Sequence, residues 1–358
     1  MRHALPLLLL LATAAGAQPA VIAGTVRDAD GAPLPGANVY LSGTARGAAS
    51  GADGRFEIAG VPPGAYRLVG SMLGFAPDAH DLRLGPGERR AVDLTLAPVA
   101  LDLGGVAVEA ARDDRWRRHL ERFTTTLLGE SANADSTRIL NPEVLAFHSR
   151  WGTLTATASA PLVIENRALG YRLTYDLTEF SASDIRVSYD GDERFEPLTP
   201  TDRAEADRWA EARARAYRGS LSHLLQALLS RTAEDEAFSG THLMTDPNGV
   251  RIPFRVSLDG FLERDADGWG TLRFRGQLDV VYAGESEAPE YLTSEWFREH
   301  RRRPDTIQRS GLLLDGLTAR IDPQGTPEDP DAIMVMGYMA FERLADRVPE
   351  EYRPPPDL

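Results

Sequence analysis

The seven histidines are the first residues whose spacing could point to metal chemistry. A hydrolytic zinc site needs a histidine and a glutamate three residues apart, a distant third ligand and a catalytic glutamate. His3 precedes an apolar amino-terminal run that we expect to be cleaved from the mature protein, so it is set aside. Three positions beyond the other six histidines stand Arg83, Arg122, Trp151, Gln226, Thr245 and Arg303, none of them a glutamate. Without cysteine, no thiolate can complete a structural zinc site either. The sequence therefore predicts no metal and no cofactor.

Ser220 and Ser222 stand beside His223 and suggest a nucleophile with its base. A serine hydrolase, however, presents its hydroxyl on a strained elbow of the Gly-x-Ser-x-Gly kind or in an equivalent arrangement. Neighbours on one helix do not place base and nucleophile productively. We interpret these serines as helix surface or as groups with satisfied hydrogen bonds.

A run of acidic residues resembles part of a calcium-binding loop. Glu263, Asp265, Asp267 and Gly268 fall at its first, third, fifth and sixth positions. The twelfth position, where calcium needs a bidentate carboxylate, is Phe274. The pattern therefore favours a hairpin turn between two strands over a calcium site.

The charged residues restrict the classes of partner. With 39 basic and 53 acidic residues the net charge is -14, which disfavours nucleic acid, whose phosphates need a basic face. Every basic residue is arginine, so Schiff-base chemistry and the phosphate loop ending in Gly-Lys are excluded. The one dense basic run, His300 to Arg303, could meet an acidic polymer or envelope phosphates, but Pro304 and the flanking acids favour a solvated loop.

The amino terminus has the pattern of a signal peptide. Arg2 and His3 precede an apolar run from Ala4 to Ala15 that is too short to cross a bilayer as a helix, and small residues end it at Ala17. This predicts a cleavable signal peptide over residues 1–17 and no transmembrane helix. Because the chain has no cysteine, we expect no lipid anchor and no disulfide. The product is expected to be periplasmic, outer-membrane-associated or extracellular.

Short strands joined by glycine and proline turns follow the signal. Val21 to Arg27 and Ala37 to Leu41 alternate in polarity, and Phe56 with Ile58 share one face. Further strand patterns follow at Tyr66 to Gly70, Asp81 to Leu84 and Ala91 to Leu96. Strands of this length and spacing predict an antiparallel β-sandwich over residues 18–110.

This stretch resembles the carboxypeptidase regulatory-like domain, a transthyretin-like β-sandwich of exported bacterial proteins. The resemblance covers about a quarter of the chain and rests on Gly24-Thr25-Val26, Pro33 to Val39, Gly54-Arg55-Phe56, Val61-Pro62 with Gly64-Ala65-Tyr66, and Gly74-Phe75. It implies an accessory module, sometimes grouped with carbohydrate-binding sandwiches, and does not imply peptidase activity.

Residues 111–130 are expected to form a linker helix. Trp116, Leu120, Phe123 and Leu127 recur at helical spacing, and we expect this apolar stripe to dock on the sheet of the following domain rather than on a partner protein. Residues 131–358 then read as an α+β domain, mostly antiparallel strands with one long helix that begins at Thr201 or Asp202 and is kinked or divided at Gly219. The predicted fold class is mostly β, α+β overall.

The second half is similar to an uncharacterised region that follows the same module in exported bacterial proteins. The similarity rests on Ile139 to Pro142, Pro161 to Asn166, Leu169-Gly170-Tyr171, Tyr217 to Ser220 and Gly337-Tyr338, and it implies no known activity. The polar and aromatic residues that could line a ligand groove or partner surface are Asn166, Tyr171, Tyr217, Arg218 and His223.

Three functions stay open at this point. The leading one is a non-catalytic, exported cell-envelope protein that binds a polysaccharide, a peptide or an outer-membrane partner. The second is a hydrolase that uses two carboxylates facing across a deep cleft, one of them shielded from water. The third is a small outer-membrane β-barrel, which the charged segment from Asp202 to Arg218 and the arginines inside strands oppose. The sequence makes no prediction of oligomeric state.

Overall fold

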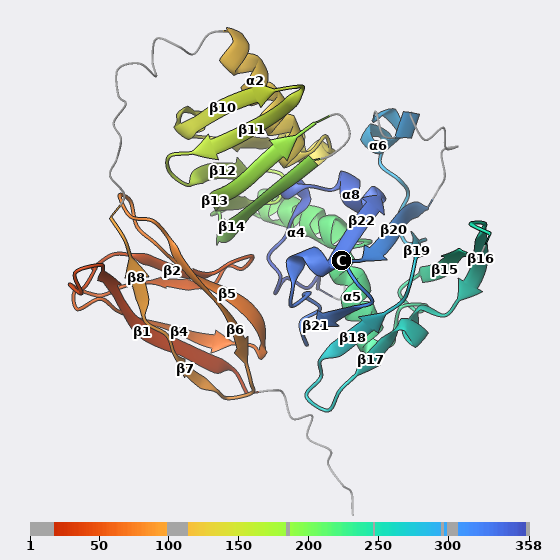
Figure 1. Ribbon diagram of the computed structural model, residues 1–358, viewed down its shortest axis with the longest axis horizontal. Helices are drawn as coiled ribbons and strands as arrows, with labels where there is room; N and C mark the ends of the chain where they lie inside the picture. Colours follow the sequence, from red (N-terminus) through yellow and green to blue (C-terminus); the bar gives the residue numbers. More distant parts are fainter. Residues whose placement is uncertain are drawn as a thin grey trace, which may run out of the picture.

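The structure is a computed structural model that describes residues 18–98, 114–183, 187–245, 248–294, 297–298 and 307–355. It is mostly β, with several antiparallel sheets and few helices, which confirms the predicted fold class. The expected signal peptide (1–17) and the basic run at 300–303 lie outside the described residues. Figure 1 shows the amino-terminal strands, in red and orange, beside the larger green and blue part of the chain.

The amino-terminal strands form the predicted sandwich of two sheets. One sheet has the order β4-β1-β7, with β8 also pairing β1, and the other has the order β3-β2-β5-β6. Pairing is antiparallel except that β7 and β8 run parallel to β1. The strands are β1 (Ala20–Asp28), β2 (Asn38–Leu41), β3 (Gly47–Ala49), β4 (Arg55–Val61), β5 (Gly64–Ser71), β6 (Asp78–Leu84), β7 (Arg89–Ala91) and β8 (Leu94–Leu96). The core of the sandwich is built by the inward-facing side chains of both sheets, which include Ile22, Val39, Ile58, Leu68 and Leu94.

A six-stranded antiparallel sheet begins the larger part of the chain. Its order is β10-β11-β13-β12-β9, with β14 pairing the full length of β13. The elements of this region are α2 (Asp114–Leu128), α3 (Ala132–Asp135), β9 (Thr137–Ile139), η1 (Pro142–Val144), β10 (Leu145–Arg150), β11 (Thr153–Ala158), β12 (Leu162–Asn166), β13 (Tyr171–Ala182) and β14 (Val187–Pro197). Helix α2 packs Phe123 against Phe147 and Phe180 of this sheet, which confirms the predicted docking of its stripe.

The predicted long helix is two helices, α4 (Arg203–Tyr217) and α5 (Leu221–Ser230). Asp202 caps α4, since its Oδ1 accepts a hydrogen bond from the backbone N–H of Glu205 at 2.8 Å. Helix α4 contributes Ala212 and Ala216 to the core of the six-stranded sheet, whereas the leucines of α5 belong to a different core. The break between the helices therefore lets one segment serve two sheets.

The core beside α5 lies between a five-stranded and a three-stranded antiparallel sheet. Their orders are β16-β15-β19-β20-β22 and β17-β18-β21. Turn Asp265–Gly268 joins β17 to β18, and Asp265 Oδ1 accepts from the N–H groups of Asp267 and Trp269, so the acidic run forms the predicted hairpin turn. The elements are β15 (Phe238–Thr245), β16 (Arg251–Val256), η2 (Leu258–Phe261), β17 (Leu262–Arg264), β18 (Gly270–Arg273), β19 (Gln277–Tyr282), α6 (Pro289–Thr293), β20 (Gln308–Leu314), β21 (Thr318–Ile321), η3 (Pro330–Ala332), β22 (Ile333–Gly337), α8 (Tyr338–Phe341) and η4 (Leu344–Asp346).

The sandwich is attached to the larger part through backbone hydrogen bonds. The N–H of Gly43 donates to Glu193 O at 2.8 Å, and the N–H of Phe195 donates to Thr44 O at 3.0 Å, so residues 43–44 pair in parallel with β14. The N–H of Glu350 donates in turn to Gly43 O at 3.0 Å. We call the interface of residues 40–45 and 64–67 with residues 176, 192–195, 322 and 347–353 the seam.

Side chains add charged contacts to the seam. Tyr40 donates its hydroxyl proton to Asp176 Oδ2 at 2.7 Å, and Arg67 Nε donates to Asp192 Oδ1 at 2.9 Å. The carboxylate of Asp322, which is 1% exposed, accepts from the N–H of Ala65 at 3.1 Å. Burying such groups costs free energy unless each has partners, and the carboxylates of Asp176, Asp192 and Asp322 have them.

Close approach at the seam depends on Gly64. A Cβ built on Gly64 would lie inside the contact distance of Asp322 Oδ2. Since Asp322 is held by the N–H groups of Gln324 and Thr326 on its own turn, it cannot retreat without breaking those bonds. The glycine of the Gly-Ala-Tyr signature therefore admits a buried carboxylate from the other part of the chain.

We predict that Gly64→Ala destabilises the folded chain by roughly 1–3 kcal/mol, because the new methyl group overpacks the seam. Gly85→Ala is the matched control in the same sandwich, since a Cβ there meets only the flexible carboxylate of Glu88 at an ordinary 3.6 Å. Urea unfolding followed by tryptophan fluorescence measures both variants. Equal midpoints for the two variants would show that Gly64 is not a contact-limited position.

The seam also predicts a pH dependence. Burial raises the pKa of Asp322 to about 6, against hydrogen bonds from backbone N–H groups, and burial raises the pKa of Glu350 to about 8, against the Arg347 guanidinium. Both groups bind a proton more tightly folded than unfolded, so their stabilisation is full below about pH 4 and is lost as pH rises through these values. We expect the urea midpoint to fall between about pH 5 and about pH 8. Asp322→Ala should flatten that slope, whereas the exposed Asp30→Ala should leave it unchanged; a slope untouched by Asp322→Ala contradicts the assignment.

Candidate functional site

Three of the five residues predicted as a ligand surface meet where α4 ends and α5 begins. Helix α4 ends at Tyr217, Arg218 follows it, and the Oγ of Ser220 caps α5 by accepting from the N–H of His223 at 3.2 Å. Gly219 has a φ of 75°, a left-handed conformation that glycine adopts without strain. The turn at Gly219 therefore folds Tyr217 back against His223, whose ring centroids lie 5.1 Å apart.

His223 is buried, and both of its ring nitrogens are engaged. The N–H of Gly219 donates to Nδ1 at 3.0 Å, so Nε2 carries the ring proton and donates it to Glu236 Oε2 at 2.8 Å. Burial lowers the pKa of His223 below its ordinary value, while the Glu236 carboxylate opposes that effect. The imidazole is thus held neutral in a single tautomer between a backbone donor and a carboxylate.

The neighbouring serine does not form a nucleophile–base pair with this imidazole. Ser220 Oγ donates to the carbonyl oxygen of Tyr217 at 2.6 Å while it accepts from the His223 N–H. Both bonds belong to helix capping, as the sequence interpretation of satisfied hydrogen bonds predicted. Nδ1 of His223, the position a nucleophile would need, is occupied by Gly219.

Tyr217 and Arg218 contact residues far away in sequence. Arg218 Nη1 donates to Glu285 Oε1 at 3.3 Å, and burial raises the pKa of Glu285 against this pairing. The ring of Tyr217 lies edge-on to Tyr352, at a centroid distance of 6.1 Å. Arg353 lies 5.7 Å above the Tyr217 ring, which is a cation–π distance.

Asn166 and Tyr171 lie in a different place, in the core of the six-stranded sheet. The side chain of Asn166 donates to Ala345 O at 2.8 Å and accepts from the N–H of Leu169 at 2.9 Å. Tyr171 is 5% exposed, and the guanidinium of Arg213 stacks 4.1 Å from its ring. Both residues therefore hold the fold together, and the structure does not bring them into one groove with His223.

The sequence did not identify the partners that complete the α4–α5 junction. Glu236 lies in the loop between α5 and β15, and Glu285 lies after β19. Tyr352 and Arg353 lie near the carboxyl end of the sequence. The Gly219-Ser220 pair between two helical segments predicts that Ser220 caps the second helix. Nothing in the local sequence indicates which carboxylate will contact the imidazole of His223. Their pairing is a result of tertiary packing.

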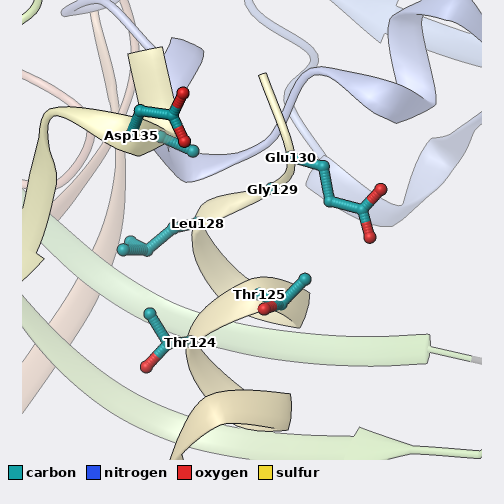
Figure 2. A pocket seen from close by; sticks show the side chains of 7 residues that line it. Thr124, Thr125, Leu128, Gly129, Glu130 and Asp135 are labelled. Atoms are coloured by element: carbon teal, nitrogen blue, oxygen red, sulfur yellow. The ribbon is translucent and has the colours of Figure 1, made fainter. Parts of the chain in front are cut away.

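Two concave places lie elsewhere, and none of the five predicted residues lines either one. An open hollow of about 310 Å³ lies at the carboxyl end of α2, lined by Thr124, Thr125, Leu128, Gly129, Glu130, Ala134 and Asp135. Figure 2 shows Glu130 and Asp135 pointing to different sides, so their carboxylates do not converge on one ligand atom. The second is a cavity of about 10 Å³ in the seam, lined by residues that include Tyr66, Asp322 and Glu350.

Among the described residues, no group of three or more histidine, aspartate or glutamate side chains is arranged to hold a metal ion. Across that part of the chain, no helix is long and apolar enough to span a bilayer.

The sandwich matches a known protein family. Residues 21–97 match the model of the carboxypeptidase regulatory-like domain. This stretch is a carboxypeptidase regulatory-like domain. The chain is also 34% identical over 87 residues to a TonB-dependent receptor of Formosa agariphila. That match covers 24% of this chain and only 8% of the receptor's length.

Solved structures resemble the chain only weakly. A proposed carbohydrate-binding protein from Bacteroides uniformis matches with 14% identity and a TM-score of 0.20, over 51% of this chain and 67% of its own. Catechol 1,2-dioxygenase from Acinetobacter matches with 13% identity and a TM-score of 0.21, over 25% of this chain and 55% of its own. Scores this low, between proteins of such different descriptions, select no activity.

We predict that His223 titrates below its ordinary pKa and keeps its proton on Nε2, which ¹⁵N NMR of the ring nitrogens measures. Its stabilisation is full above about pH 6.5 and decreases as pH falls, because the unfolded chain then binds the extra proton. His223→Ala should lose roughly 1–3 kcal/mol, since it leaves the N–H of Gly219 without an acceptor and removes the ring hydrogen bond to Glu236, which then keeps only its bond from Thr232. His223→Asn, which can keep an acceptor for Gly219, should lose less, and the exposed His80→Ala should lose little. A protonated Nδ1 at neutral pH would contradict the geometry.

Proposed function

We propose that the protein is a binding and accessory protein of the cell envelope, exported by its signal peptide, whose partner is a polysaccharide, a peptide or an outer-membrane component. In this proposal residues 18–110 and 131–358 are two domains that act as one body. The likeness of about a quarter of the chain to part of a TonB-dependent receptor supports an envelope location. The seam is the observation that carries the proposal.

The seam makes the sandwich a fixed part of a larger surface. Residues 43–44 extend the edge of the six-stranded sheet by backbone pairing with Glu193 and Phe195. A module that worked alone on a flexible linker would not need a buried carboxylate of the other domain at its own Gly64–Ala65 turn. Fixed orientation is an advantage for a protein that holds a partner in one geometry, because less conformational freedom is lost on binding.

The same geometry weighs against the hydrolase alternative. Asp322 and Glu350 have the raised pKa values expected of catalytic carboxyl groups. Both, however, line the seam cavity of about 10 Å³, which has room for about one water molecule. A sugar ring or a peptide bond cannot enter that space, so these carboxyl groups serve the interface.

The proposal is tested with the purified mature chain on arrays of polysaccharides and peptides, in parallel with assays for reducing ends and new amino termini. We expect retention without turnover. Arg67→Ala, which removes the ion pair with Asp192 across the seam, should weaken retention several-fold. Arg89→Ala is the matched control, because its ion pair with Glu57 lies within the sandwich. Release of product from any probe would overturn the proposal, and so would blank arrays together with no retention by isolated outer-membrane fragments.

A further inference from the structure

The hairpin of β15 and β16 exposes an apolar surface that nothing described so far uses. Among the described residues ten large hydrophobic side chains are exposed, and four of them lie within this one hairpin. They are Met244, Val250, Ile252 and Phe254, with exposed fractions of 50%, 57%, 39% and 47%. Single exposed apolar residues are ordinary on protein surfaces, whereas a cluster marks an interaction site.

The register places three of these side chains on one face. Met244 lies opposite Ile252, and Phe254 lies opposite His242 two residues along each strand. His242 in turn lies opposite Leu278 of β19, which is fully buried. The exposed face is therefore the continuation of the core face of the five-stranded sheet beyond the elements that cover it. Figure 1 shows the hairpin at the outer margin of the molecule, projecting past β19 and β20.

Three exposed arginines without carboxylate partners lie on or near the hairpin, although Arg255 follows Phe254 in β16 and therefore points to the opposite face of the hairpin. Arg255 of β16 is exposed, and so are Arg273 and Arg275, which flank Phe274. His242 contacts Arg275 O at 2.6 Å, so the backbone of Arg275 lies against β15. None of the three forms an ion pair with any residue in the ranges that the structure describes, although the chain as a whole carries a net charge of -14. The neighbouring Asp279 accepts from Gln277 at 2.6 Å.

The edge of β16 is poorly suited to pairing with another strand. Pro253 stands in the middle of β16 and has no N–H to donate. Proline is accepted in edge strands with its nitrogen facing outward, where it interrupts the row of donors that an added strand would need. Side chains, rather than backbone, are what this hairpin presents.

We propose that the β15–β16 hairpin docks on an anionic lipid surface. Met244, Ile252 and Phe254 enter the interfacial layer, and Arg275, which lies against His242 on the same face, binds lipid phosphates. Arg255 adds a positive charge from the other face of the hairpin, and this combination of apolar and basic side chains holds peripheral proteins at membranes. Apolar side chains beside unpaired arginines match an anionic, partly apolar surface better than they match a second copy of an acidic chain. The proposal deepens the proposed function and rests on its envelope location.

The test is flotation of the purified mature chain with vesicles of phosphatidylethanolamine and phosphatidylglycerol, and with vesicles of phosphatidylcholine alone. We expect binding to the anionic vesicles that weakens as salt rises. The double variant Ile252→Ser with Phe254→Ser should lower the partition coefficient at least about tenfold. Arg255→Gln with Arg275→Gln should weaken binding and reduce its salt dependence. Leu73→Ser, which removes an exposed side chain on the sandwich, is the matched control and should bind as the wild type does.

The urea midpoint of each variant is measured as a control for folding. The replaced side chains are exposed, so we expect their replacement to leave the midpoint unchanged. Wild-type chain that fails to float with anionic vesicles, or equal losses in Leu73→Ser and the double variant, would overturn the lipid proposal. So would a dimer in sedimentation that Phe254→Ser dissociates, because the occupant would then be a second copy. Retention on polysaccharide or peptide arrays without vesicle binding would leave the proposed function standing and remove only the lipid site.

Discussion

The arrangement of this molecule depends on one contact, the buried carboxylate of Asp322 against the backbone of Gly64 and Ala65. A carboxylate that is 1% exposed is stable only if backbone donors replace its lost water, and here they come from both its own turn and the sandwich. Neither part of the chain satisfies this group alone. The interface is therefore specific in orientation, because a small rotation would leave the carboxylate without one of its donors.

The carboxyl-terminal segment connects that contact to the α4–α5 junction. The N–H of Glu350 binds Gly43 at the seam, and three residues later Arg353 donates to Gln226 of α5 at 3.0 Å and stacks over Tyr217. Titration of the seam carboxyl groups and of His223 has opposite effects on stability, since burial raises the pKa of Asp322 and lowers the pKa of His223. The carboxyl groups stabilise the fold at low pH, whereas His223 stabilises it at high pH. The folded chain is thus expected to be most stable where these two dependences cross, at mildly acidic pH.

Local sequence patterns were sufficient for the elements but not for their assembly. The sandwich followed from turn glycines and alternation, and the stripe of α2 docked as its spacing predicted, because both depend on neighbours in sequence. The chemistry of Asn166 and Tyr171 suggests ligand binding, but the structure places both in a core. There the amide of Asn166 forms hydrogen bonds with backbone groups, and the ring of Tyr171 fills space beside Arg213. Gly219, which donates to the His223 ring, is a local neighbour, but Glu236 is 13 residues away, and no spacing rule encodes which carboxylate reaches the ring.

The same limit explains why the hairpin could not be identified beforehand. A strand such as Arg251 to Val256 looks alike whether its apolar residues face a core or water, since alternation reports two faces and not what covers them. Only the register with β19 shows that the covered face at Leu278 runs outward to Ile252 and Phe254 without cover. The seam leaves this hairpin free, because the sandwich contacts β14, the Asp322 turn and residues 347–353 instead. A body whose two parts are joined through buried carboxylates thus presents the apolar side chains of the β15–β16 hairpin close to the unpaired Arg275, which lies against β15.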